Sequence, residues 1–172
     1  FLAQLKHEME SNRLLQLLFP KVLWQHPDRQ APRWSLDRGL VVRRKSNPKE
    51  ATIEAYGLVD GMPTGSHFDL RVYDDVVTED SVTTPDMINK TTDMWALSNN
   101  LGTANGRVWA TGTRYHFNDT YREILKRGSL RERRYAATED GTATGKPILL
   151  TREQLARKRA DQGPYIFSCQ ML

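Results

Sequence analysis

The second half of the chain alternates between short apolar stretches and amphipathic segments. Residues 68–77 predict a strand, whose apolar run ends on Asp74 and Asp75. Thr84 and Pro85 predict the start of a helix, because a hydroxyl N-cap precedes a proline at the first helical position. This region therefore begins with a strand followed by a helix.

The segments that follow continue the alternation. Strands are predicted over 107–113, 131–138 and 165–170, and helices over 119–127 and 152–162. Asn118 or Asp119 is the expected N-cap of the first of these helices, and Gly163-Pro164 is expected to end the second. Strands that alternate with helices indicate an α/β fold with a largely parallel sheet and flanking crossover helices.

The first third of the chain has weaker patterns. Apolar positions recur near helical spacing over residues 1–18, and Pro20 ends that pattern. Residues 25–39 hold two prolines among mixed charges and predict a connecting loop. Residues 40–45 and 51–59 are rich in strand-forming side chains. One helix, one loop and two short strands are therefore expected before residue 60.

Composition narrows the class of protein. The chain has 172 residues, of which 38% are hydrophobic and 27% charged, as in folded soluble proteins rather than disordered ones. No apolar run approaches the roughly 18 residues of a membrane span, so no membrane partner is expected. A single cysteine, Cys169, excludes an intrachain disulfide and a cysteine-rich zinc site. A reducing, cytosolic setting is therefore expected.

The net charge of +4 is the sum of two oppositely charged regions. Residues 60–93 carry eight acidic side chains against two basic ones, whereas residues 121–134 carry six basic side chains against two acidic ones. On charge alone, two solvated faces explain this pattern. The alternative is a cation site in the first region and a phosphate site in the second.

Asp74 and Asp75 are candidate catalytic residues. They follow an apolar strand, and ligands of open α/β sheets bind at the carboxyl ends of the strands. Because side chains alternate along a strand, the two carboxylates point in different directions and can serve different purposes. One can bind a hydrated Mg²⁺, and the other can orient or deprotonate a water molecule. The simpler alternative is an aspartate-rich turn.

A second candidate lies at the end of the 107–113 strand. The hydroxyl side chains and the glycine of Thr111-Gly112-Thr113 allow a close approach to a phosphate, and Arg114 could pair with it. The alternative is an ordinary transition from strand to loop. A phosphate-binding loop is not found, because residues 141–147 are one residue short of the pattern and have Pro147 in place of the hydroxyl. Those residues predict a surface hairpin or loop instead.

Taken together, these motifs resemble a known family. Residues 56–68, 70–78 and 110–120, with the closing segment 165–170, resemble in order and spacing the large terminase subunit of tailed bacteriophages. The resemblance covers nearly the whole chain. It implies a P-loop NTPase-like fold of the ASCE type, with the N-terminal phosphate-loop part missing from this chain. In that family an ATPase motor, followed by an RNase H-like nuclease, drives DNA into a preformed capsid through the portal.

The resemblance assigns roles to the motif residues. By it, Asp74 would coordinate Mg²⁺ with ATP at the end of a Walker B segment, and Asp75 would stand where many relatives carry the glutamate that activates water. The residues after the second strand would form the coupling motif, which senses the γ-phosphate: Thr111, Gly112 and Thr113, with Arg114 beside them. Six basic residues are candidates for contact with DNA or with a neighbouring subunit, or are merely solvated: Arg122, Lys126, Arg127, Arg131, Arg133 and Arg134.

The resemblance also divides the chain. Residues 1–39 would be the leading helix and connecting loop of the motor domain, 40–162 the ATPase core fragment, and 163–172 the start of a linker toward an absent nuclease domain. The implied function is ATP hydrolysis coupled to packaging of double-stranded viral DNA, with ATP and Mg²⁺ as cofactors. The chain alone is expected to be inactive.

The implied partners are double-stranded DNA, the portal protein, the small terminase subunit and further copies of the chain in a ring. The implied location is the capsid portal in the host cytoplasm. Two alternatives stay open. One is a non-catalytic nucleic-acid or capsid-binding module that retains the fold. The other is a nuclease fragment that uses Asp69, Asp74 and Asp75 as metal ligands.

Overall fold

The computed structural model describes residues 1–172, which form two units, Phe1–Phe68 and Asp69–Leu172. In the first unit, helices α1 (Leu2–Ser11) and α2 (Arg13–Leu18) replace the single helix expected over residues 1–18. The break falls at Asn12, which has an extended ψ of 93° and whose side chain accepts a hydrogen bond from the Leu15 N–H. An N-cap residue in the middle of the apolar pattern therefore starts a second helix.

The rest of the first unit contains short elements. The predicted loop holds helix α3 (Pro27–Gln30) and strand β1 (Trp34–Ser35), which pairs antiparallel with β2 (Gly39–Leu40). The strands expected over 40–45 and 51–59 are wrong beyond Leu40, since Ile53 makes only an isolated bridge to it. A small apolar core forms around these elements: Leu23, Leu40, Val41, Val42 and Ala51.

The second unit is organised around two strands that a helix connects. Strand β3 (Phe68–Asp74) is followed by the 3₁₀ turn η1 (Asp80–Val82) and helix α4 (Pro85–Ser98). A further 3₁₀ turn, η2 (Asn99–Leu101), leads into strand β4 (Gly102–Thr111). As predicted, the Thr84 side chain caps α4 by accepting a hydrogen bond from the Met87 N–H.

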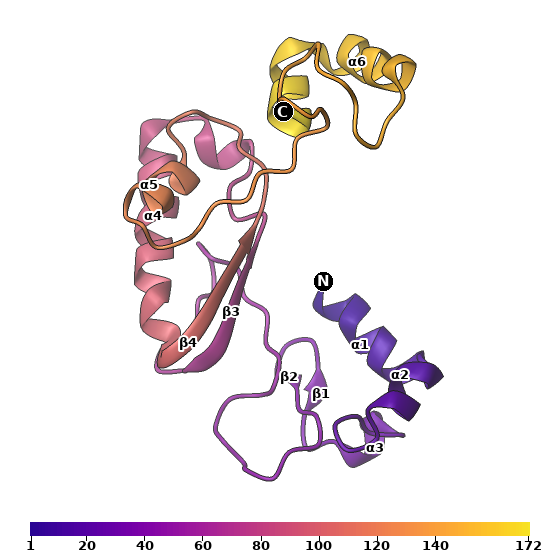
Figure 1. The fold of residues 1–172 in the computed structure, drawn as a ribbon. Helices are drawn as coiled ribbons and strands as arrows, with labels where there is room; N and C mark the ends of the chain where they lie inside the picture. The colour runs from indigo at the N-terminus through magenta and orange to yellow at the C-terminus, as the bar shows by residue number, and fades with distance from the viewer. The chain divides into compact units, whose positions relative to one another are not determined.

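The two strands run parallel. Near their starts, the Thr103 hydroxyl donates to the Asp69 carboxylate at 2.9 Å, and at their ends the Asp75 N–H donates to the Thr111 carbonyl at 3.1 Å. Figure 1 shows β3 and β4 side by side, with α4 alongside them. The prediction of an α/β fold with parallel strands and flanking helices is confirmed at this level, for a sheet of two strands.

Helix α4 packs on the strands through a buried face that includes Trp95. The rings of Tyr73 and Trp95 lie 6.3 Å apart, and the Tyr73 hydroxyl pairs with that of Ser98 at 2.6 Å. The apolar residues of 107–113 are typical of a buried strand, but Trp109 on β4 is 60% exposed, and Val72 on β3 is 51% exposed. A two-stranded sheet with one packed helix leaves apolar side chains of both strands uncovered.

The chain after β4 contains helix α5 (Thr120–Lys126) and helix α6 (Arg152–Met171). The predicted end of the first helical stretch at Gly163 is confirmed, because α6 consists of two helical stretches that meet at a kink there. The extended segment expected over 165–170 is wrong, since those residues are helical. Gly163 supplies a φ of 73°, and Pro164 then begins a second helical stretch, because proline is tolerated in the first turn. The strand expected over 131–138 does not form either, since only Thr138 makes a bridge, to Pro147.

Candidate functional site

The carboxylate pair lies at the end of β3. Asp74 is the last residue of the strand, and Asp75 follows with a φ of 45°, the one non-glycine residue with a positive φ. Such a conformation is unfavourable for most L-residues and clusters at functional sites. Both side chains are exposed and make no hydrogen bond or ion pair within the chain. Both carboxylates are therefore free to bind a ligand.

The loop after β4 lies next to this pair. The hydrogen bond from the Asp75 N–H to the Thr111 carbonyl joins the first residue after β3 to the last residue of β4. The parallel pairing therefore brings together the two motifs that the sequence singled out 36 positions apart, Asp74-Asp75 and Thr111-Gly112-Thr113. The carboxyl ends of parallel strands are where α/β proteins bind their ligands.

A residue that the sequence reasoning missed holds this second loop. The Tyr121 hydroxyl, on α5, donates to the Thr111 carbonyl at 3.2 Å. A Cβ atom on Gly112 would lie 2.0 Å from the same hydroxyl oxygen, so only glycine fits there. The available signal in the sequence was an aromatic side chain in the first turn of a predicted helix, which by itself does not indicate this contact.

The Tyr121 phenol is protonated over the physiological range. Burial raises its pKa from 10.0 to about 12, the backbone N–H of Val77 opposes this, and the negative charge of Asp75 adds to it. The tyrosine side chain is buried and lies close to Asp75. It therefore stays a hydrogen-bond donor to Thr111 at neutral pH.

Arg114 has a structural partner. Its Nε donates to the Asp119 carboxylate at 3.0 Å, and one of its terminal nitrogens donates to the Phe117 carbonyl at 3.0 Å. Asp119 is fully buried, and its other carboxylate oxygen accepts from the Arg122 N–H, which confirms it as the N-cap of α5. The guanidinium predicted to face phosphate is thus bound to the cap of the following helix.

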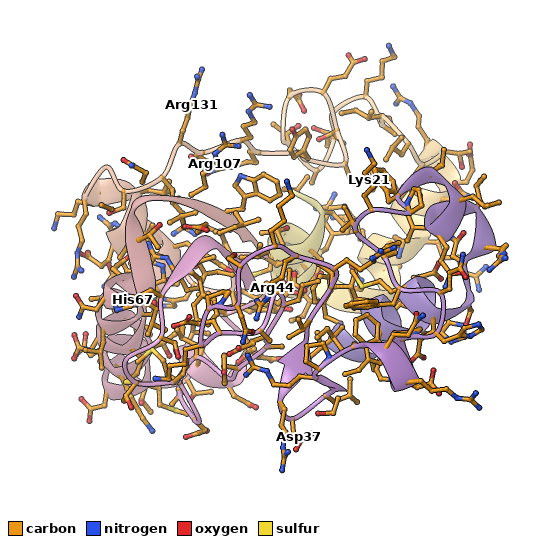
Figure 2. The ribbon with its side chains drawn as sticks, turned by 90° about the horizontal axis from the view of Figure 1, so that it is seen from below. Lys21, Asp37, Arg44, His67, Arg107 and Arg131 are labelled. Atoms are coloured by element: carbon orange, nitrogen blue, oxygen red, sulfur yellow. The ribbon has the colours of Figure 1, made fainter.

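The six basic residues separate into two groups. Those on and just after α5 include Arg122, which donates to Asn118, and Lys126, which lies 3.9 Å from Glu123. The others line a cleft of about 1160 Å³ together with the Thr111–Arg114 segment: Arg131, Arg133 and Arg134. Arg134 is paired with Glu132 at 3.0 Å, whereas Arg131 extends away from the ribbon in Figure 2.

A nuclease site made of Asp69, Asp74 and Asp75 does not fit this geometry. Asp69 and Asp74 are five positions apart on one strand, which separates them by about 16 Å at the usual rise of a strand. One ion cannot bind both carboxylates. No group of three or more histidine, cysteine, aspartate or glutamate side chains is placed to hold a metal ion.

Comparison of the chain with protein-family models, with curated proteins and with solved structures finds no match. None of its helices is both long enough and apolar enough to cross a membrane.

Proposed function

We propose that the chain is part of an ATP-hydrolysing motor that packages double-stranded viral DNA into a preformed capsid. The observation that carries this proposal is the hydrogen bond of 3.1 Å between the Asp75 N–H and the Thr111 carbonyl, which joins the two motif loops. A parallel β-α-β unit with carboxylates after its first strand is also an expected part of a P-loop NTPase-like fold of the ASCE type.

The residues of the chain fit a magnesium ion but not the phosphates of ATP. Asp74 offers an exposed carboxylate without a protein partner, and Mg²⁺ in nucleotide sites takes one or two carboxylates and keeps several waters. The glycine-rich residues 141–146 instead close a hairpin, in which Lys146 pairs with Glu139 at 2.9 Å. The proposal therefore assigns phosphate binding to residues outside this chain.

Each motif residue has a role in the proposal. ATP and Mg²⁺ supply the phosphoryl group and the charge that neutralises it. Asp74 would hold the ion, and Asp75 would orient or deprotonate the attacking water. Thr111, Gly112 and Thr113 would respond to the γ-phosphate, and Arg114 would fix the end of their loop through Asp119. The same proposal divides the chain as the resemblance does. Residues 1–39 would be the leading helix and loop of the motor domain, 40–162 its ATPase core fragment, and 163–172 the start of a linker.

We place the proposed DNA contact in the cleft beside the coupling loop. Arg131 and Arg133 line it and make no ion pair, so their charge is available to phosphodiesters. Arg122, Lys126 and Arg127 would face DNA or a neighbouring subunit of the ring. The portal protein and the small terminase subunit are the further proposed partners, and the capsid portal in the host cytoplasm is the proposed location.

ATP turnover by the full-length protein tests the proposal. Asp75→Asn should lower turnover by about 100-fold or more, the usual contribution of a positioned general base. Asp80→Asn is the matched control, because Asp80 is an exposed aspartate on η1 without a side-chain partner, and its variant should stay within about twofold. Turnover that Asp75→Asn leaves unchanged would instead favour the non-catalytic binding module.

A further inference from the structure

Tyr121 contacts the end of β4 and the loop after it, and it lies close to the loop after β3. Its hydroxyl donates to the Thr111 carbonyl, and its ring and hydroxyl fill the space next to Gly112. The Asp75 carboxylate and the backbone N–H groups of Val76 and Val77 lie close enough to act on the ionisation of its phenol. One side chain on α5 thus contacts the proposed coupling loop and lies close to the loop of the proposed catalytic carboxylates.

The need for glycine at position 112 comes from this contact. The φ of Gly112 lies outside the left-handed region, so its backbone conformation is open to any residue. What excludes a side chain is Tyr121, whose Oη, Cζ and Cε2 atoms would lie 2.0, 2.8 and 3.1 Å from an added Cβ. The glycine and the tyrosine therefore form a matched pair.

The helix that carries Tyr121 is itself firmly anchored. The Thr120 hydroxyl pairs with that of Thr92 on α4 at 2.9 Å, and both are buried. Asp119, fully buried, caps the same turn and binds Arg114 at the far end of the coupling loop. The tyrosine is therefore held on a rigid turn.

We propose that Tyr121 is a positioning residue, whose hydroxyl holds the Thr111–Thr113 loop in register with Asp75. This inference rests on the proposed ATPase function for its kinetic consequence. Removal of the hydroxyl would leave the ring in place but free the loop after β4. The water-activating carboxylate and the loop that responds to phosphate would then no longer be held at a fixed separation.

A double-mutant cycle tests the pairing without any ligand. Gly112→Ala should lower the midpoint of thermal unfolding by about 5 °C or more, because the added methyl group meets the phenol oxygen. In a Tyr121→Phe background the same substitution should lower the midpoint by less, since the contact of 2.0 Å with the oxygen is gone while the contact of 2.8 Å with Cζ remains. Equal losses in the two backgrounds would overturn the pairing.

Kinetics of the full-length protein test the positioning role. Tyr121→Phe should lower kcat roughly tenfold and leave KM within about twofold, because the lost bond aligns the loop rather than binds substrate. Tyr73→Phe is the matched control: it removes a buried tyrosine hydroxyl bond to Ser98 and should leave kcat within about twofold.

The outcomes separate the two proposals. A wild-type protein that turns over ATP and a Tyr121→Phe variant with the same kcat would overturn the positioning role and leave the ATPase function standing. A full-length wild-type protein without turnover would overturn the ATPase function, and the kinetic role with it. The pairing of Gly112 with Tyr121 would then still be decided by the thermal cycle.

Discussion

Asp119 joins the loop after β4 to the start of α5, and its replacement tests the local account of this turn. One carboxylate oxygen accepts from the Arg122 N–H at 3.0 Å and caps the helix, and the other accepts from Arg114 Nε at 3.0 Å. The side chain has no exposed surface. Asp119→Ala removes both bonds, whereas Asp119→Asn keeps an oxygen for the cap and loses the charge that Arg114 pairs with.

The size of each loss follows from these contacts. An N-cap acceptor contributes about 1 kcal/mol to the free energy of unfolding. A hydrogen bond between charged groups contributes about 2 kcal/mol, taken from the middle of its range because the Arg114 side chain is 35% exposed and can reach water. Asp119→Ala should therefore lower the free energy of unfolding by about 3 kcal/mol, and Asp119→Asn by about 2 kcal/mol.

Urea unfolding followed by circular dichroism measures both variants. Asp86→Ala is the control, because Asp86 is an exposed acidic residue in the first turn of α4 and should change stability by less than about 0.5 kcal/mol. If Asp119→Asn is as destabilising as Asp119→Ala, the cap contributes nothing. If Asp119→Ala falls below about 1 kcal/mol, neither bond stabilises the turn as described.

Three further measurements test the packing of Trp95, the ionisation of the Tyr121 phenol, and DNA binding in the cleft that Arg131 and Arg133 line. Trp95→Ala should lower the free energy of unfolding by about 4 kcal/mol and Trp95→Phe by about half of that, since the side chain is 2% exposed; equal losses would refute packing as the cause. The raised pKa of Tyr121 contributes stability that is fully present below pH 10 and is lost as pH rises through about 12. Between pH 10 and pH 12 wild type should therefore lose about 2 kcal/mol more than Tyr121→Phe, and parallel curves would refute this. Replacing Arg131 and Arg133 with glutamine should lower the slope of log affinity for DNA against log salt by about 2, whereas Arg29→Gln, in the first unit, should leave it unchanged.

The sequence predicted the elements whose signals are local. The N-cap Thr84 was predicted, and Asp119 was one of two candidates with Asn118, because a cap acts on backbone groups within one helical turn. Strand β3 was predicted from its own apolar residues. The break at Gly163 was predicted in the same way, but the extended segment expected after Pro164 was wrong, because Pro164 starts a second helical stretch.

The candidate site was predicted only as separate pieces. Asp74-Asp75 and Thr111-Gly112-Thr113 could be chosen from residue types, but their adjacency needed the parallel pairing of β3 and β4. The expectation that Arg114 faces phosphate could not anticipate Asp119, because a guanidinium binds whichever carboxylate the fold brings near. The exposure of one face of the sheet was not predicted for a similar reason. The apolar residues of a strand do not indicate whether helices pack on one face of its sheet or on both.

By itself the sequence determined where the helices of the second unit begin and which charged residues follow its first strand. Only the tertiary structure decided that Tyr121 excludes a side chain at Gly112, and that Asp75 takes a positive φ beside Thr111. Caps and strand formers act over a few residues, whose order the chain fixes. The contact of Tyr121 with Thr111 spans 10 positions, and that of Asp75 with Thr111 spans 36. Such contacts depend on how helices pack on strands, which no local pattern encodes.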